Sequence, residues 1–204
     1  MSDFNCPNCG DAVPAQISYV TMVTCPSCST TLYLDGAGLH AAGQSGEMHD
    51  GPKLFDLGDT VGLGDATVQI LGHARFSYGR GWWDEFWGLD ESQRSVWVSV
   101  DEGDIVLQYP VKAEFWPPVA PAAPLGSTFQ HRDETWRVIE RDKAECIALK
   151  GSFGEQLAVG ERYSFVNAQS DSGALMSGEF WEGGRSWFLG FWFDPFDVRI
   201  EVHP

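Results

Sequence analysis

Two pairs of cysteines near the N-terminus place the tightest constraint on how this chain can fold. Cys6 and Cys9 form one Cys-x2-Cys pair, Cys25 and Cys28 form a second, and fifteen residues separate the pairs. Each pair predicts a tight turn that points two thiolates at one ion, and two such turns supply the four sulfur ligands of a tetrahedral zinc site. The spacing is typical of a zinc ribbon, which we predict over residues 1–34 with one zinc ion.

A metal also explains how so short a segment can fold. A segment of about thirty residues cannot bury enough apolar surface to be stable alone, whereas structural zinc contributes about 10–16 kcal/mol in small peptides. Because four sulfurs leave no open coordination position, we expect a structural ion rather than a catalytic one. The alternative interpretation is a pair of disulfides or a redox-active dithiol.

The sequence shows no targeting or membrane segment. Residues 1–11 lack a basic stretch followed by an apolar run, so no secretory signal is expected. The longest uncharged stretches, 12–34 and 115–131, are interrupted by cysteines or prolines, and neither approaches about 20 continuous apolar residues. We therefore expect a cytoplasmic protein that does not insert directly into a membrane.

The charge of the chain restricts its partners. The net charge is −16, and the first basic residue in the sequence is Lys53, well beyond the cysteine pairs. A surface that binds phosphate groups needs lysine or arginine, so neither nucleic acid nor anionic lipid is an expected partner. A protein partner, including one associated with a membrane, or a small cation suits this charge better.

The remainder of the chain predicts a mainly β protein. Residues 35–55 are rich in Gly, Ala, Ser and His without apolar periodicity, which is typical of a flexible linker. Residues 56–204 alternate short β-branched and aromatic runs with Gly and Asp turns, and helical signals are nearly absent. We predict an antiparallel β domain, either a closed barrel or two packed sheets.

This β domain carries the pattern of an internal repeat. Gly58-Asp59-Thr60 and the strand signal after it recur as Gly126-Ser127-Thr128 at a constant offset of 68 residues (126 − 58). Each half then reaches a Glu-Phe-Trp sequence, and each has an aromatic residue twelve positions after that glutamate. We predict two related halves, 56–110 and 126–202, joined by a proline-rich extended connection over 111–125.

The two Glu-Phe-Trp sequences supply the candidate binding residues. Alternate side chains of a strand share a face, so Trp83, Glu85 and Trp87 are expected on one face. If a two-fold axis relates the halves, Glu85 and Glu179 occupy equivalent places and converge on one cleft. Alternatively, each glutamate accepts hydrogen bonds within its own half, with Arg75, Arg80 and Arg185 as candidate donors. The predicted candidate surface comprises Trp82, Trp83, Glu85, Trp87, Glu179 and Trp181.

Motifs of common enzyme classes are missing from the sequence. It contains no phosphate-binding loop, no His-Glu-x-x-His and no Gly-x-Ser-x-Gly. Cys146 lies in an apolar run, where a buried, inert thiol is the expected state. We therefore predict no catalytic residue and do not expect an enzyme.

The order of several weaker motifs resembles a bacterial family catalogued as domain of unknown function 4178. The resemblance covers residues 56–202. Members of that family often resemble zinc-ribbon fusions, and their genes tend to lie near genes for polyamine synthesis enzymes, small membrane proteins and phage-shock-like proteins. The resemblance implies a stress-related accessory protein and transfers no catalytic residue. The motifs are Gly58-Asp59-Thr60, Val68-Gln69-Ile70-Leu71-Gly72, Trp83-x-Glu85-Phe86-x-x-Leu89, Val96-Trp97-Val98, Trp136-Arg137-Val138, Ala144, Val159-Gly160-Glu161-Arg162-Tyr163 and Ser177-Gly178-Glu179.

Three functional hypotheses follow. The first is a non-enzymatic adaptor that binds a protein partner within a membrane- or envelope-stress assembly through exposed tryptophans. The second is a receptor for a small organic cation such as a polyamine, with Glu85, Glu179 and neighbouring indoles as the binding groups. The third is a carbohydrate-directed hydrolase that uses the paired glutamates, for which two carboxyl groups in one open cleft are required.

Overall fold

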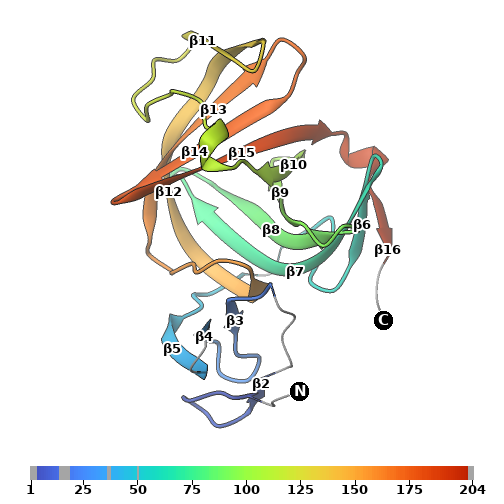
Figure 1. Ribbon diagram of the computed structural model, residues 1–204. Helices are drawn as coiled ribbons and strands as arrows, with labels where there is room; N and C mark the ends of the chain where they lie inside the picture. The colour runs from blue at the N-terminus through green and yellow to red at the C-terminus, as the bar shows by residue number, and fades with distance from the viewer. Residues whose placement is uncertain (1–3, 14–18, 36–37, 50, 202–204) are drawn as a thin grey trace.

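The protein is almost entirely β-structure (Figure 1). A computed structural model describes residues 4–13, 19–35, 38–49 and 51–201. Within these ranges the only helical segments are two short 3-10 helices, η1 (Ala113–Phe115) and η2 (Pro195–Asp197). No helix in the described part of the chain has the length and apolar character that crossing a membrane requires. The prediction of a mainly β, antiparallel fold is confirmed.

Two five-stranded meanders make up the main domain. In each meander successive strands pair as antiparallel hairpins. The first consists of β6 (Thr60–Leu63), β7 (Ala66–Ser77), β8 (Trp82–Asp90), β9 (Ser95–Asp101) and β10 (Asp104–Pro110). The second consists of β11 (Thr128–His131), β12 (Glu134–Phe153), β13 (Arg162–Ser170), β14 (Leu175–Trp181) and β15 (Gly184–Phe193).

The two meanders join along two seams and close a ring. The last strands, β10 and β15, pair from Ile105↔Phe193 to Pro110↔Phe188. The long strands β7 and β12 pair from Cys146↔Phe76 to Gly151↔Gly72. The resulting order, β7-β8-β9-β10-β15-β14-β13-β12 and back to β7, is a closed eight-stranded antiparallel barrel. We call this barrel the ring.

The halves repeat the same fold, including the backbone of their turns. Strands β13, β14 and β15 begin 80 residues after β8, β9 and β10 (162 − 82, 175 − 95 and 184 − 104). Gly58 and Gly126 both have positive φ angles, and each donates its amide hydrogen to the long strand that follows. The predicted two related halves are thus visible in matching strands and matching turns.

This strand correspondence corrects the predicted equivalence of the two glutamates. Glu85 lies on β8, the third strand of its meander, whereas Glu179 lies on β14, the fourth strand of the other. With the offset of 80, the residue equivalent to Glu179 in the first meander is Ser99, and the residue equivalent to Glu85 in the second meander is Phe165 (179 − 99 and 165 − 85). The recurrence of Glu-Phe-Trp therefore does not mark equivalent positions. The offset between the halves is 68 residues at the start of each half and 80 residues from β8 and β13 onward. The twelve extra residues (80 − 68) lie in the longer β12 and the loop after it.

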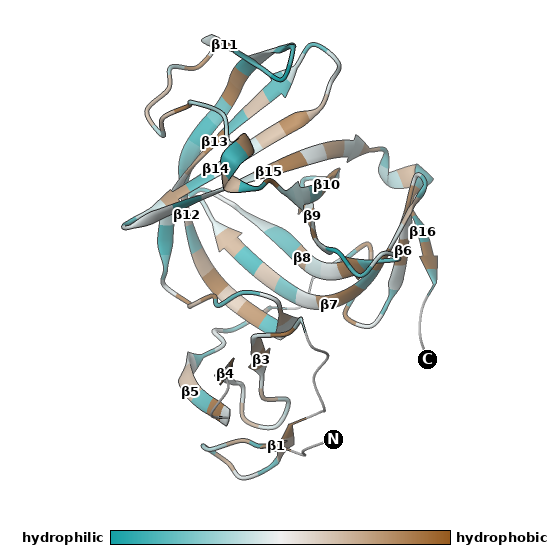
Figure 2. Cartoon of the chain, viewed as in Figure 1, coloured by the Kyte–Doolittle hydropathy of each residue, from teal (hydrophilic) through white to brown (hydrophobic). Residues whose placement is uncertain are grey.

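The strands sort their side chains between the inside of the ring and two outer cores. Hydrophobic and hydrophilic residues alternate along the long strands in Figure 2. On β8, Trp83 and Trp87 face a central cluster inside the ring, whereas Phe86 packs into a separate core on the other face. This is the alternation that the sequence predicts. The second meander has its own outer core, around Trp136 and Trp187.

Segments outside the ring cover these outer cores. Strand β16 (Arg199–Glu201) pairs with β6, and Ile200 packs against the core of the first meander. The proline-rich connection over 111–125 covers the second core, where Val119 is buried and Trp116 is partly buried. Part of this predicted extended connection forms η1.

The four-cysteine module partly extends the same sheet: its last three strands join that sheet, and its first two form a separate two-stranded sheet. It contains β1 (Phe4–Asn5), β2 (Ala12–Val13), β3 (Met22–Thr24), β4 (Thr30–Asp35) and β5 (Gly38–Gln44). Strand β3 pairs with the end of β12, at Ser152↔Val23 and Phe153↔Met22. The module therefore lies directly below the ring in Figure 1, next to the end of β12.

The structure differs from the predicted linker over 35–55. Residues 38–44 form β5, which pairs with β4, and Gly46 bridges to Ala148 of the ring. The Gly and Ala content that suggested a linker instead suits an edge strand with mostly exposed side chains. The module and the ring are joined here by backbone hydrogen bonds, including Leu149 N–H to the Ser45 carbonyl at 2.7 Å.

Candidate functional sites in the cysteine module and the ring interior

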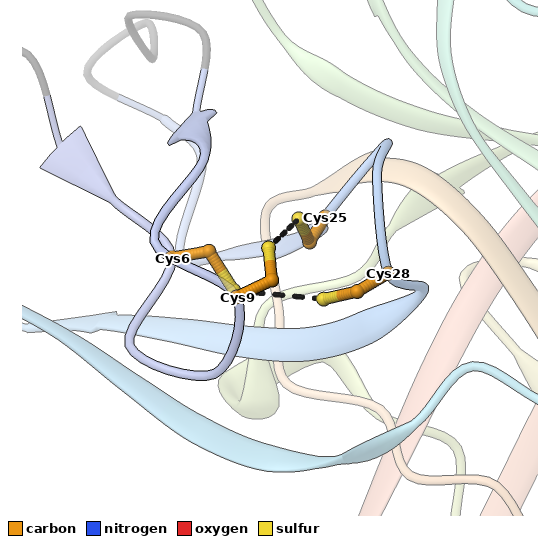
Figure 3. A group of neighbouring side chains, drawn as sticks. All are labelled: Cys6, Cys9, Cys25 and Cys28. Carbon is orange, nitrogen blue, oxygen red and sulfur yellow. Dashed lines mark hydrogen bonds between the residues drawn. The ribbon is translucent and has the colours of Figure 1, made fainter.

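The four N-terminal cysteines converge on one point (Figure 3). Their sulfur atoms all lie within 4.8 Å of one another. The Sγ atoms of Cys6 and Cys28 are 3.7 Å apart, and those of Cys9 and Cys25 are 3.8 Å apart. A tetrahedral ion with metal–sulfur bonds of about 2.3 Å places its sulfurs about 3.8 Å apart. The donor set and its spacing therefore fit a four-sulfur metal site.

Two matching turns hold the cysteines. The amide of Gly10 donates to the carbonyl of Cys6, and the amide of Ser29 donates to the carbonyl of Cys25, at 2.8 and 2.9 Å. Gly10 and Ser29 both have positive φ angles, of 80° and 58°. Each turn thus bends its chain so that two thiols point the same way, as the sequence spacing predicts.

The second candidate site is a cavity inside the ring, which we call the first cavity because another cavity adjoins it. Glu85 and Glu179 both line it although they come from different strands of different meanders. The cavity has a volume of about 180 Å³. Two further carboxylates, Glu155 and Glu161, belong to its lining and lie exposed at its mouth. The predicted convergence of Glu85 and Glu179 therefore occurs, by a route other than two-fold equivalence.

Aromatic rings form much of the remaining wall of this first cavity. They come from β7 and β9 of the first meander and from β13, β14 and β15 of the second. Trp97 donates from Nε1 to Glu155 Oε1 at 3.0 Å, so that one indole also positions a carboxylate. The aromatic lining residues are Phe76, Trp97, Tyr163, Trp181 and Phe188.

Neutral donors hold the central carboxylates. Glu85 accepts a hydrogen bond from Trp83 Nε1 at 2.9 Å and another from the Ser99 side chain. Glu179 is hydrogen-bonded to the Tyr163 side chain. Because these donors carry no charge, they orient the carboxylates without neutralising them.

Burial controls the protonation of these groups. It raises the pKa of Glu85 to about 7, against hydrogen bonds from Trp83 and Ser99 that lower it. It also raises the pKa of Glu179 to about 8, and the charges of Glu155 and Glu85 add to this rise. Burial likewise raises the pKa of Tyr163, followed by the charges of Glu179 and Glu85. Burial is the largest cause of each shift, and neighbouring carboxylates add to it.

No basic side chain balances this charge within the cavity. Its lining contains no lysine, arginine or histidine among the residues that the structure describes. The arginines proposed as partners of the glutamates bind elsewhere. Arg75 pairs with Asp84 at 2.8 Å, Arg80 with Asp142 at 3.5 Å, and the Arg185 guanidinium lies 5.2 Å from the Trp116 ring. The first cavity is therefore strongly acidic.

The structure divides the predicted tryptophan surface. Trp83 and Trp87 are buried, at 9% and 1% exposure, and contribute to the central cluster. Trp82 and Trp181 are exposed. The Arg75 guanidinium lies 3.9 Å from the centre of the Trp82 ring, and Trp181 lines the first cavity. Of the four tryptophans predicted for this surface, only Trp82 and Trp181 are therefore exposed.

Sequence reasoning missed several lining residues. Trp97 is the cross-strand partner of Trp87, so the turn between β8 and β9 together with the alternation of side chains was a usable signal for it. Glu155 and Glu161 lie in the loop that joins β12 to β13. No local pattern marks these two residues, because their place depends on the closure of the ring.

The comparisons with known proteins give one match. A family model described as "Domain of unknown function (DUF4178)" matches residues 56–195, which cover the ring and its outer strand β6. Neither the curated proteins nor the solved structures contain a significant match. The match covers the first cavity and leaves the cysteine module outside it.

Proposed function

Because the chain belongs to the DUF4178 family, whose description names no activity, we propose a function from the site itself: the ring binds a small organic cation in its first cavity. One observation carries this proposal. Four carboxylates and five aromatic rings line one cavity whose described lining has no basic residue. Carboxylates attract a positive charge, and the faces of aromatic rings attract it further while tolerating its alkyl groups.

An organic cation fits this cavity better than a metal ion. Bound calcium requires six to eight oxygen ligands at about 2.3–2.6 Å, which the protein must bring close together. Among the described residues, the four cysteines are the only group of three or more His, Cys, Asp or Glu ligands close enough to hold a metal. The cavity carboxylates are spread around a wall of aromatic rings, an arrangement suited to a larger ion.

The protonation of the two central glutamates does not favour the hydrolase hypothesis. A glycoside hydrolase needs one carboxyl group protonated and the other ionised, and it achieves this by separating their pKa values. Here burial raises the pKa of both groups, to about 7 for Glu85 and about 8 for Glu179. Two similar carboxyl groups in one acidic cavity are better suited to holding a cation.

Thermal unfolding with and without spermidine tests the proposed function. We expect millimolar spermidine to raise the melting temperature of the intact protein, because a ligand that binds only the folded state stabilises it. Glu85→Gln should abolish most of this rise. Glu182→Gln makes the same chemical change in the turn after β14, outside the cavity, and should leave the rise intact. An equal response of both variants, or no response of the unaltered protein, contradicts the proposal.

We propose zinc as the ion of the four-cysteine site. Zinc is the usual occupant of a tetrahedral site with four thiolates, and the ligand spacing fits it. All four coordination positions are then taken by sulfur, so the ion would act in folding and would bind no substrate.

The adaptor hypothesis remains a second proposal, favoured by exposed aromatic residues. Phe191 and Trp192 are exposed on β15, and Phe196 of η2 is 96% exposed. Large exposed apolar side chains are candidate contacts for a protein partner. An affinity pull-down from solubilised host membranes tests this proposal. A partner retained by the unaltered protein and lost with Phe196→Ser, a change outside both cavities, supports it, and identical recovery with both proteins contradicts it.

A further inference from the structure

A second cavity adjoins the first inside the ring. Its volume is about 280 Å³, and it shares four lining residues with the first cavity. These are Glu85, Gln108, Tyr163 and Glu179. The two cavities therefore meet at the central glutamates and extend from them in different directions.

The second cavity contains buried acceptor oxygens that lack a donor. Gln108 is only 7% exposed, and its Oε1 atom has no hydrogen-bond partner. Asp101 Oδ1 and Asn167 Oδ1 line the same cavity and also lack partners. Leaving a buried polar atom unpaired destabilises the folded protein. All three atoms accept hydrogen bonds, so the group that would satisfy them must donate.

The second cavity is acidic as well. Besides the shared glutamates it is lined by Asp101, Asp104 and Glu140. Burial and the charges of nearby carboxylates raise the pKa of Asp101. Glu140 accepts from the amide of Asn167 at 2.9 Å, a neutral donor. The lining that the structure describes contains no lysine, arginine or histidine. Arg80, whose guanidinium lies 5.4 Å from the ring of the lining residue Tyr78, pairs with Asp142.

Both cavities reach the surface through carboxylates. Glu155 and Glu161 are exposed at the first cavity, and Asp104 and Glu140 are exposed at the second. The half-buried Glu85 and Glu179 lie between these two ends. Carboxyl groups are therefore distributed along the interior at three levels, at each end and in the middle.

We infer that the two cavities are subsites of one elongated site for a linear amine that carries two or more ammonium groups. This inference rests on the proposed function and extends it from one charge to several. One ammonium group occupies the first cavity among Glu155, Glu161 and the aromatic rings. Another donates to Gln108 and Asp101 in the second cavity. The apolar chain between them passes Tyr163, near Glu85 and Glu179.

A chain-length series on the unaltered protein provides the first test. Calorimetric titration would compare butylamine, 1,4-diaminobutane and spermidine at one pH and ionic strength. We expect spermidine to bind at least about tenfold more tightly than butylamine, equivalent to about 1.4 kcal/mol. Equal affinities for butylamine and spermidine overturn this inference but leave the proposed function standing. If none of the three amines binds, the proposed function fails as well.

Variants of the second cavity provide the other test. Asp101→Asn removes a charge and keeps the shape of the side chain. We expect it to weaken spermidine binding about tenfold and to leave butylamine binding unchanged, because the single ammonium group occupies the first cavity. Glu182→Gln is the control. A weakening of both amines to the same extent, or of neither, contradicts the division into subsites.

Discussion

At the scale of single residues, Glu85 and Glu179 store an energetic cost that depends on pH. Their pKa values rise on folding from 4.5 to about 7 and about 8. Asp84 and Asp101 act on Glu85, whereas Glu155, Glu161 and Tyr163 act on Glu179. Between the unfolded and folded pKa values the native protein binds more protons than the unfolded chain. Their contribution to stability is therefore complete below about pH 4.5 and is lost as the pH rises to about 8.

This pH dependence predicts a measurable change in the free energy of unfolding. Denaturant titrations should give a smaller free energy at pH 8 than at pH 5. Asp56, Asp84 and Asp90 have lowered pKa values, so their stabilising effect is lost only at more acidic pH and does not mask the trend. Glu179→Gln should flatten the curve, and Glu182→Gln should not. A slope unchanged in Glu179→Gln would show that this carboxyl group is not responsible.

Individual residues were predictable from the sequence to different degrees. The alternation of β8 correctly grouped Trp83 and Trp87 on one face, because the period of a strand is local. The meeting of Glu85 and Glu179 was predicted for a reason that the strand order contradicts. Glu155 was not predictable, because only the tertiary path of its loop brings it to the cavity.

At the scale of elements, strand β12 connects the cysteine module to the first cavity. Its end pairs with β3, and the loop that follows it carries Glu155 and Leu157 into the cavity wall. The module also holds this loop with side chains. Tyr33 donates from its hydroxyl to the Leu157 carbonyl at 3.1 Å, and the Leu157 amide lies 3.3 Å from Met22 Sδ. The mouth of the cavity is therefore built partly from the cysteine module.

This connection predicts that metal removal opens the cavity mouth. A four-cysteine metal module of this size depends on its metal for folding, so chelation should release β3 and β4 and raise amide hydrogen exchange over residues 152–157. Exchange across the seam between β10 and β15, which pair with no strand of the module among the described residues, should stay slow. Tyr33→Phe should raise amide hydrogen exchange at Leu157 alone, and elemental analysis should show that the metal content is unchanged. Unchanged exchange over 152–157 after chelation would refute the coupling.

Elements were recovered from the sequence where the local signal was strong. The cysteine turns, the hairpins and the duplication all have local signatures, and all are present. Strand β5 was not recovered, since its Gly- and Ala-rich sequence has little intrinsic strand preference and it forms through pairing with β4. Tertiary pairing decided its structure.

At the scale of the whole molecule, the ring depends on two seams between distant parts of the chain. The sequence predicted a closed barrel or two packed sheets without distinguishing them. The difference lies in the pairing of β7 with β12, whose residues Phe76 and Cys146 are far apart in sequence. No local pattern reports such a contact. The family match covers residues 56–195, and the description of the family names no activity.

The position of β12 in the chain also has a consequence for biosynthesis. Strand β7 has no partner for its Gly72–Phe76 edge, and β3 none for its outer edge, until β12 has been made. A nascent chain that ends before Cys146 therefore presents two unpaired strand edges at once, the kind of surface that recruits neighbouring chains. On the ribosome, the first-made half of the protein must wait for the second before either its module or its barrel can be completed.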